Sequence, residues 1–423
     1  MFIGPIALFI MSQPIKTKRI QSIDALRGFA LAGVVLVHMV EQYVGGPAPE
    51  GFMEGINGLP DQIIQGLLQI FFSGKFFALF SILFGLSFAI QMRSAEEKNV
   101  KFGWRFLWRA VLLFVIGYIH QLFYRGDILT IYAVLAPFLI PFYKISTKWI
   151  LVMAGFIFLG IPRFIAFYIF GGESITGIHP MMDINNEYIM RYFDTIQNGS
   201  LIEVFKINAI YGMQTKIDFQ MSLFGRFYYT FGYFLIGLWL GRTGVFKDIA
   251  SHAKTIKNIM LWAIAAMLVS VVITFATFAS IAQPIDNNSF QFALGINFMD
   301  WVNISMASII LCGFLLLSQK EVWQKRLGFF APYGRMALTN YIFQSVIGTF
   351  IIFGWGLGYL GQIRVSFLFI LALVFIFVQA TISKYWLRTF RYGPLEWLWR
   401  CGTYMKWQPF LKDRSTPDSP SSD

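Results

Sequence analysis

Ionisable side chains occur inside long apolar stretches of this 423-residue sequence. Such residues are costly in a bilayer and are functional candidates by default. His38 lies in SIDALRGFALAGVVLVHMVEQY (residues 22–43), and Lys75 lies in IFFSGKFFALFSILFG; each has apolar neighbours on both sides. An imidazole suits proton transfer near neutral pH, and an ammonium group can stabilise a developing oxyanion. The two residues therefore indicate general base and oxyanion chemistry within a membrane.

Four further ionisable residues are predicted to share their depth: His120, Asp127, Arg163 and Arg226. A rise of 1.5 Å per residue places all six in one layer in the outer half of the membrane. Each also has a simpler interpretation, since Asp127 could cap a helix and Arg163 could extend to the interface. Together they predict a polar cavity that is open to the outside and suits an anionic or strongly polar ligand. Asp127 is the expected partner of Lys75 or of a histidine.

The first apolar helix connects this layer to the opposite side. Asp24 and Arg27 are three residues apart and can pair along a helix. Eleven residues separate Arg27 from His38, which places both within about 20° of one helix face. Gly28 and Gly33 would allow another helix or a ligand to approach closely. A structural ion pair is the alternative interpretation of Asp24 and Arg27.

A second group of polar residues is predicted at the inner face. Arg335 begins a late helix in PYGRMALTNYIFQS, and RYGPLEWLWR follows the last one. Arginines here could bind the phosphates of a nucleotide-like donor, or could simply follow the excess of cations on cytoplasmic loops. The chain has no Walker A, dinucleotide-binding or HExxH motif.

The elements that position these residues are predicted to be membrane-spanning helices. Hydrophobic residues make up 57% of the chain and charged residues 13%, and apolar runs reach about 20 residues. The predicted class is all-α, a polytopic membrane protein. The net charge of +12 fits cationic cytoplasmic loops, so no nucleic-acid partner is predicted. The two cysteines and the four histidines form no metal-binding spacing, so no metal is predicted.

About ten spans are predicted. They cover residues 23–43, 66–91, 105–124, 127–143, 148–170, 224–241, 257–281, 297–317, 335–355 and 365–388. Lys and Arg gather on alternate connections, which places both termini in the cytoplasm. The predicted organisation is a cytoplasmic segment (1–22), a single membrane domain (23–400) and a cytoplasmic tail with a disordered end (401–423). A long outer loop, residues 171–223, holds two amphipathic segments, which predict either a lid over a binding site or helices resting on the membrane.

Five motifs carry a resemblance to a known family: SIDALRGFALAGVVLVH, FSGKFFALFSILFG, RGDILTIYA, PYGRMALTNYIFQS and GPLEWLWR. Together they resemble the YeiB-like family of bacterial inner-membrane proteins. The D-x-x-R-G opening also resembles a wider group of transmembrane acyltransferases, which includes bacterial O-acetyltransferases of surface polysaccharides and the lysosomal heparan-glucosaminide acetyltransferase. Asp24, Arg27 and Gly28 match that opening, and His38 matches a histidine of the O-acetyltransferase branch.

This resemblance implies transfer of an acyl group from cytosolic acyl-CoA to a sugar-like hydroxyl or an amine outside. Arg27 and Arg335 would anchor the CoA phosphates, together with Asp24 and Gly28. His38 or His120 would be the general base, Asp127 would orient it, and Lys75 would stabilise the oxyanion. Arg163 and Arg226 would bind the acceptor. The alternative hypothesis is a transporter or exporter of a polar or anionic solute, with the same layer as its binding site.

Overall fold

The computed structural model describes residues 20–43, 58–99, 102–171, 175–176, 187–222, 224–281 and 289–412. The predicted N-terminal segment, the end of the tail and part of the 171–223 loop therefore lie largely outside the described residues. Within these ranges the chain is helical, with no β-strand and an isolated bridge between Phe390 and Leu411. The all-α prediction is confirmed.

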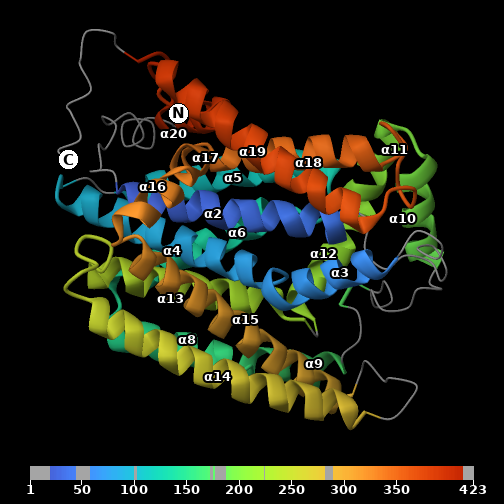
Figure 1. The fold of residues 1–423 in the computed structure, drawn as a ribbon, viewed down its shortest axis with the longest axis horizontal. Coiled ribbons are helices and arrows are strands. Elements are labelled where there is room, and N and C mark those ends of the chain that lie inside the picture. Colours follow the sequence, from blue (N-terminus) through green and yellow to red (C-terminus); the bar gives the residue numbers. More distant parts are fainter. Residues whose placement is uncertain are drawn as a thin grey trace, which may run out of the picture.

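Helices run along a common direction and form a layered bundle (Figure 1). The N-terminal half contains α2 (Gln21–Val37), η1 (His38–Gln42), α3 (Leu59–Phe71), α4 (Lys75–Glu96), α5 (Gly103–Phe123), α6 (Leu129–Leu135), η2 (Ala136–Phe138), α7 (Leu139–Lys144), α8 (Thr147–Phe158) and α9 (Ile161–Phe170). The remainder contains α10 (Glu187–Asn198), α11 (Leu201–Ile207), η3 (Asn208–Gly212), α12 (Met213–Met221), α13 (Arg226–Thr243), α14 (Ala253–Ala279), α15 (Phe290–Leu317), α16 (Glu321–Gly328), α17 (Phe330–Arg335), α18 (Ala337–Ile352), α19 (Val365–Thr389) and α20 (Pro394–Tyr404).

The centre of the bundle is α2, and the periphery includes α14. In the most apolar window of each, 83% of the α2 residues are buried but only 11% of the α14 residues. The exposed side chains of α14 include Leu261, Trp262, Val272 and Phe275, and α19 exposes Phe367 and Phe377 in the same way. Apolar surface of this extent is what lipid contact requires. The functional candidates on α2 are thus shielded by other helices.

Glycines allow the innermost helices to touch. A Cβ atom added to Gly28 of α2 would lie 2.1 Å from the carbonyl oxygen of Phe330 on α17. A Cβ atom added to Gly237 of α13 would lie 2.0 Å from the carbonyl oxygen of Ile82 on α4. Gly33 instead accepts the ring of Phe76. The close approach predicted at Gly28 and Gly33 is therefore made by the protein's own helices, with Gly28 against backbone and Gly33 against a side chain.

Each of the ten predicted spans overlaps one or more helices, but these helices differ in length. Six helices of the described chain are long and apolar enough to cross a membrane by themselves, and a bent pair, α8 with α9, would make a seventh. The bend of 43° lies at Gly160, whose φ of +81° favours glycine. Leu129–Lys144 and Ala337–Ile352 are apolar but shorter. The protein is a polytopic helical membrane protein, while ten spans remain a prediction.

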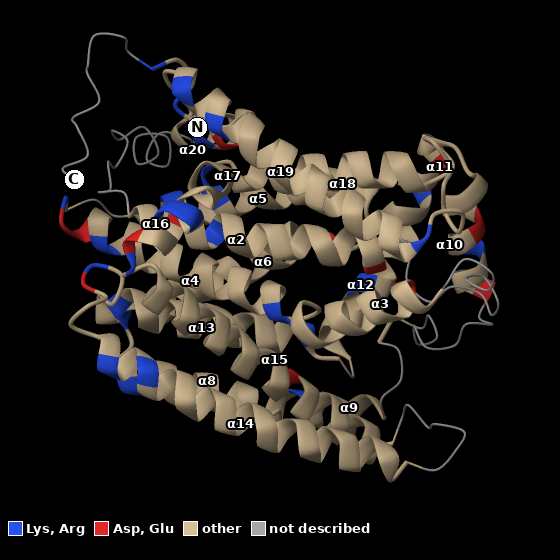
Figure 2. Ribbon diagram, viewed as in Figure 1, with Lys and Arg blue, Asp and Glu red and all other residues tan. Residues whose placement is uncertain are grey.

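The two ends of the bundle differ in their content of Lys and Arg. Lys and Arg gather at the end that holds α16, α20 and the start of α14 (Figure 2). The opposite end holds α3, α10 and α11 (Figure 1). We call these the inner and the outer end, following the rule that cations favour the cytoplasmic side. The placement of both termini in the cytoplasm rests on that rule.

The long outer loop contains the two predicted amphipathic helices. One is α10, and the other is α11 continued by η3; η3 is a π-helical turn. Ser200 and Glu203 form a capping box at the start of α11, which explains why the helix begins there. The loop then continues into α12, which packs against α13 and η3. Residues of α12 help to form the site described next.

Candidate functional site

A cavity of about 320 Å³ lies in the outer half of the bundle. Its wall comes from α2, η1, α4 and the turn before it, the turn between α5 and α6, α6 itself, η3, α12, α13 and α18. The polar side chains of the wall are His38, Glu41, Tyr124, Arg125, Asp127, Tyr132, Thr215, Lys216, Gln220, Arg226 and Tyr341. His38, Asp127 and Arg226 were predicted from the sequence to share such a cavity.

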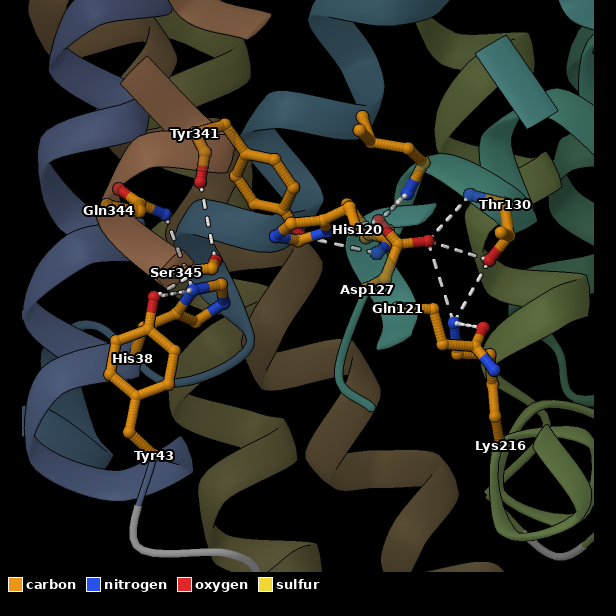
Figure 3. A network of polar contacts seen from close by, with 12 residues as sticks. His38, Tyr43, His120, Gln121, Asp127, Thr130, Lys216, Tyr341, Gln344 and Ser345 are labelled. Atoms are coloured by element: carbon orange, nitrogen blue, oxygen red, sulfur yellow. Dashed lines mark hydrogen bonds and ion pairs between the residues drawn. The ribbon is translucent and has the colours of Figure 1, made fainter. Parts of the chain in front are cut away.

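Asp127 is the centre of a buried network that joins α5, α6 and the outer loop (Figure 3). Its Oδ1 lies 2.8 Å from Nδ1 of His120, and its Oδ2 lies 3.6 Å from Nζ of Lys216. The carboxylate also accepts the backbone N–H groups of Leu129 (3.1 Å) and Thr130 (2.9 Å) at the start of α6. Asp127 is thus both a helix cap and the partner of a histidine, two interpretations that the sequence left open.

Lys216 brings the outer loop into this network. Its Nζ donates to Oε1 of Gln121 (2.5 Å) and to Oγ1 of Thr130 (3.0 Å). Burial lowers the pKa of Lys216, and the charge of Asp127 opposes this shift. Helix α12 is therefore fixed over the cavity by a buried cation.

His120 itself does not line the cavity. Its side chain is fully buried, and its Nε2 atom has no hydrogen-bond partner among the described residues. Its ring packs against Tyr341 and Tyr124, with ring centroids 5.0 and 6.1 Å apart. Of the two candidate bases, His38 is the one on the cavity wall.

Arg163 and Arg226 share one carboxylate. Arg163 is fully buried and forms an ion pair with Asp300, and it also contacts Asn297 and Tyr229. Arg226 lies 4.0 Å from the other oxygen of Asp300, and its guanidinium group is near the rings of Phe77 and Phe219. Only Arg226 lines the cavity. The structure therefore separates the two arginines: Arg163 joins α9, α13 and α15, and Arg226 lines the cavity.

Lys75 is likewise withdrawn from the cavity wall. Its Nζ donates to the backbone carbonyl of Gln69 at 2.6 Å. Glu41 lies in the cavity wall and accepts a hydrogen bond from Ser73. Lys75 and Asp127 do not contact each other directly; Asp127 is paired with His120 and Lys216.

A second cavity, of about 260 Å³, lies toward the inner end. Arg27, Arg109 and Arg335 are in its wall, and Arg109 is stacked 4.2 Å above the ring of Trp399. Arg27 pairs with Asp24 at 3.1 Å, as the i, i+3 spacing predicts, and donates to Ser87 at 2.9 Å. The wall thus has three guanidinium groups, a donor set that suits phosphate oxygens.

One carboxylate of this inner wall has a structural task. Glu396 of α20 accepts the backbone N–H groups of Leu338 (2.7 Å) and Thr339 (3.1 Å), and the hydroxyl of Thr339 (2.6 Å). It thereby caps the start of α18 and joins GPLEWLWR to PYGRMALTNYIFQS, two of the motifs found in the sequence. Burial raises the pKa of Glu396, and the hydrogen bonds from Thr339 oppose this shift.

The two cavities meet at three aromatic side chains. Phe80, Tyr132 and Tyr341 belong to the walls of both. The hydroxyl of Tyr132 lies 2.6 Å from that of Ser81, and the hydroxyl of Tyr341 accepts the backbone N–H of Ile128 at 3.2 Å. These hydrogen bonds hold the aromatic partition in place. Arg27 and His38 lie on either side of it, on one helix.

Several residues of the site are absent from the sequence-based candidates. Asp300 could have been found, because it is an acidic residue in a predicted span and satisfies the rule used for His38. Lys216 lies in a polar stretch of the outer loop, where nothing in the sequence indicates burial. Gln344 lies in the same motif as Arg335, PYGRMALTNYIFQS, but the structure places it against His38 in the outer half.

Comparison with known proteins gives relatives over nearly the full length. The chain is 27% identical to the uncharacterized protein YxaH of Bacillus subtilis over 413 residues, which cover 95% of this chain and 98% of that protein. It is 27% identical to an uncharacterized 39.9 kDa protein encoded in the amylase 3′ region of Bacillus acidopullulyticus, over 93% of this chain and 96% of that protein. A segment of 67 residues, 16% of this chain, is 43% identical to the uncharacterized protein YeiB of Escherichia coli and covers 17% of it.

The fold and the site define the class, a polytopic α-helical membrane protein with a cavity that includes charged side chains in each half of its bundle. Residues 240–406 match the family model described as a protein of unknown function, DUF418. The resemblance to the YeiB-like family is therefore confirmed.

Proposed function

We propose that this protein is an acyltransferase of the bacterial inner membrane, which moves an acyl group from cytosolic acyl-CoA to a polar acceptor on the other side. One observation carries the proposal: cavities in the two halves of the bundle meet at Phe80, Tyr132 and Tyr341. The inner cavity offers guanidinium groups for phosphates, and the outer cavity offers an imidazole for proton transfer. A donor and an acceptor could thus approach one point from two compartments.

Each cavity has a separate task in this proposal. Arg27, Arg109 and Arg335 would bind the phosphates of CoA, so that its pantetheine arm points toward the aromatic partition. His38 would accept the proton of the acceptor hydroxyl or amine while that group attacks the thioester carbonyl. The carbon–sulfur bond then breaks, CoA leaves as its thiol after taking up a proton, and the acyl group stays on the acceptor. Arg226 would bind anionic or polar groups of the acceptor.

The test is transfer by the purified protein in lipid nanodiscs. Radiolabelled acetyl-CoA is supplied with a panel of sugars and amines, and both free CoA and labelled product are measured. We expect His38→Gln to abolish transfer while CoA binding stays intact, and Arg335→Gln to weaken CoA binding. Lys325→Gln is the matched control, since Lys325 is exposed and pairs only with Glu321 among the described residues. Absence of transfer to every acceptor would refute the proposal, whether or not CoA binds.

The same pair of cavities, separated by the aromatic partition, would also serve a transporter. In that case the aromatic partition would open and a whole polar or anionic solute would pass, with Arg226 and His38 in its binding site. Flux into proteoliposomes without any covalent product, abolished by His38→Gln, would decide for transport.

A further inference from the structure

The imidazole of His38 is held at one edge by two polar side chains. Its Nδ1 atom lies 3.4 Å from the hydroxyl of Tyr43 and 3.4 Å from the side-chain amide of Gln344 (Figure 3). A neutral imidazole carries its proton on either Nδ1 or Nε2, and only the nitrogen without a proton can act as a base. The neighbours of Nδ1 therefore decide which nitrogen is basic.

The chain of hydrogen bonds beyond Tyr43 has a fixed direction. It ends at the backbone carbonyl of Tyr341, which can only accept, and the hydroxyl of Ser345 donates to it at 3.3 Å. The oxygen of Ser345 then accepts the hydrogen of Tyr43, at 3.1 Å. Since that hydrogen is used, the oxygen of Tyr43 is left to accept a hydrogen from Nδ1 of His38.

Gln344 is compatible with the same direction only when its amide is turned over, because as placed its Nε2 atom, a donor, lies 3.4 Å from Nδ1 of His38. Nitrogen and oxygen of a side-chain amide are told apart by their hydrogen bonds, and Oε1 of Gln344 is buried with no partner among the described residues. Turned over, this amide presents Oε1 to Nδ1 of His38 as a second acceptor. Both neighbours then favour a proton on Nδ1.

A π-helical turn makes the first contact possible. His38 begins η1, and the backbone N–H of Tyr43 donates to the carbonyl of His38 at 2.8 Å, an i to i+5 bond. In an α-helix, residues five apart point about 140° away from each other. The wider turn returns Tyr43 to the side of His38, and turns of this kind are frequent at functional sites.

We infer that Tyr43, Ser345 and Gln344 are positioning residues that keep His38 in the tautomer with a proton on Nδ1 and a free electron pair on Nε2. His38 lines the outer cavity, so Nε2 is the nitrogen left for a ligand. The inference rests on the proposed function for its purpose, because it gives the proposed base its basic nitrogen. It concerns the resting protein, however, and can be tested without donor or acceptor.

The test is ¹⁵N NMR of the full-length protein in lipid, labelled at histidine, at mildly alkaline pH. The chain has four histidines, and a His38→Gln sample identifies the signals of His38. We expect a protonated Nδ1 and a bare Nε2. Ser345→Ala frees the hydrogen of Tyr43 to donate to Nδ1, so it should shift the tautomer ratio roughly fivefold toward the Nε2–H form, as one ordinary hydrogen bond allows.

Tyr43→Phe is the second variant, and it should also raise the Nε2–H fraction because Nδ1 loses an acceptor. Tyr132→Phe is the matched control, since its hydroxyl bonds to Ser81 outside this chain of hydrogen bonds, and it should leave the ratio unchanged. A bare Nδ1 in the natural protein, or an unchanged ratio in both Ser345→Ala and Tyr43→Phe, would overturn the inference.

Where transfer is measurable, Tyr43→Phe should lower kcat about tenfold with the KM for acyl-CoA unchanged. Loss of the tautomer preference in a protein that still transfers acyl groups would refute the inference alone, and absent transfer with the tautomer intact would refute the proposed function alone.

Discussion

Replacement of Asp127 by Asn tests the buried network most directly. The substitution keeps the shape of the side chain but removes its charge. Asp127 lies 2.8 Å from His120 and 3.6 Å from Lys216. At the start of α6 it accepts three hydrogen bonds, from the backbone N–H of Leu129 and from the backbone N–H and the hydroxyl of Thr130. In Asp127→Asn the ammonium group of Lys216 is left buried without a counter-charge.

Removing one partner of a buried ion pair costs about 3–5 kcal/mol. The cost here should be near the lower end, about 3 kcal/mol, because Lys216 keeps its hydrogen bonds to Gln121 and Thr130. For a chain of this length such a loss should lower the unfolding temperature by about 3 °C. The double variant Asp127→Asn with Lys216→Met should recover most of the lost stability, because it also removes the uncompensated charge. The expected coupling energy between the two substitutions is about 2 kcal/mol.

The assay is thermal unfolding in one detergent, followed by tryptophan fluorescence, for the natural protein, both single variants and the double variant. Glu321→Gln is the matched control, because it removes the same charge from an exposed pair with Lys325 and should change the stability by less than about 0.5 kcal/mol. Strictly additive effects of the two substitutions would show that Asp127 and Lys216 are not coupled and would refute this account of how α12 is fixed.

Two further substitutions probe the packing and the aromatic partition. Gly237→Leu should prevent folding, because even a Cβ atom would lie 2.0 Å from the carbonyl oxygen of Ile82. Gly313→Ala is the control: its added Cβ atom would have no neighbour within 4 Å, so it should leave a single symmetric peak in gel filtration. Tyr132→Ala should join the two cavities, so that a cysteine introduced in place of Ser87 on the inner wall becomes reactive toward a membrane-impermeant thiol reagent added outside. Equal labelling of Ser87→Cys with and without Tyr132→Ala would count against the partition.

The apolar runs of the sequence were sufficient to predict the class and the positions of the helices. The number of times the chain crosses the membrane was not predictable in the same way, because hydropathy does not report how a helix bends or ends. Gly160 bends the α8–α9 pair, and Pro137 lies in the short 3₁₀ turn between α6 and α7. Such local geometry decides whether an apolar run is one crossing, part of one, or a re-entrant segment.

For the site, depth was more predictable than contact. The rise per residue correctly grouped His120 with Asp127, because both lie at the outer end of neighbouring elements. It could not separate Arg163 from Arg226, since their difference lies in the rotation of each helix about its axis. Lys216 was missed because it enters the network from α12, a part of the loop with no apolar pattern to fix its position.

The ionisable residues of α2 are best explained by the cavities, not by stability. A buried ion pair can often be replaced by apolar residues with little loss of stability. Stability alone therefore gives weak reason to keep Asp24, Arg27 and His38 in Gln21–Glu41, the most buried candidate span of the described chain. Each is provided with a partner: Arg27 with Asp24 and Ser87, and His38 with Tyr43. Arg27 and His38 then line the inner and outer cavities respectively, on either side of the same aromatic partition. A helix that served only to pack the bundle would need neither the charges nor the partners that compensate them, which is why the two cavities that these residues line are the better explanation.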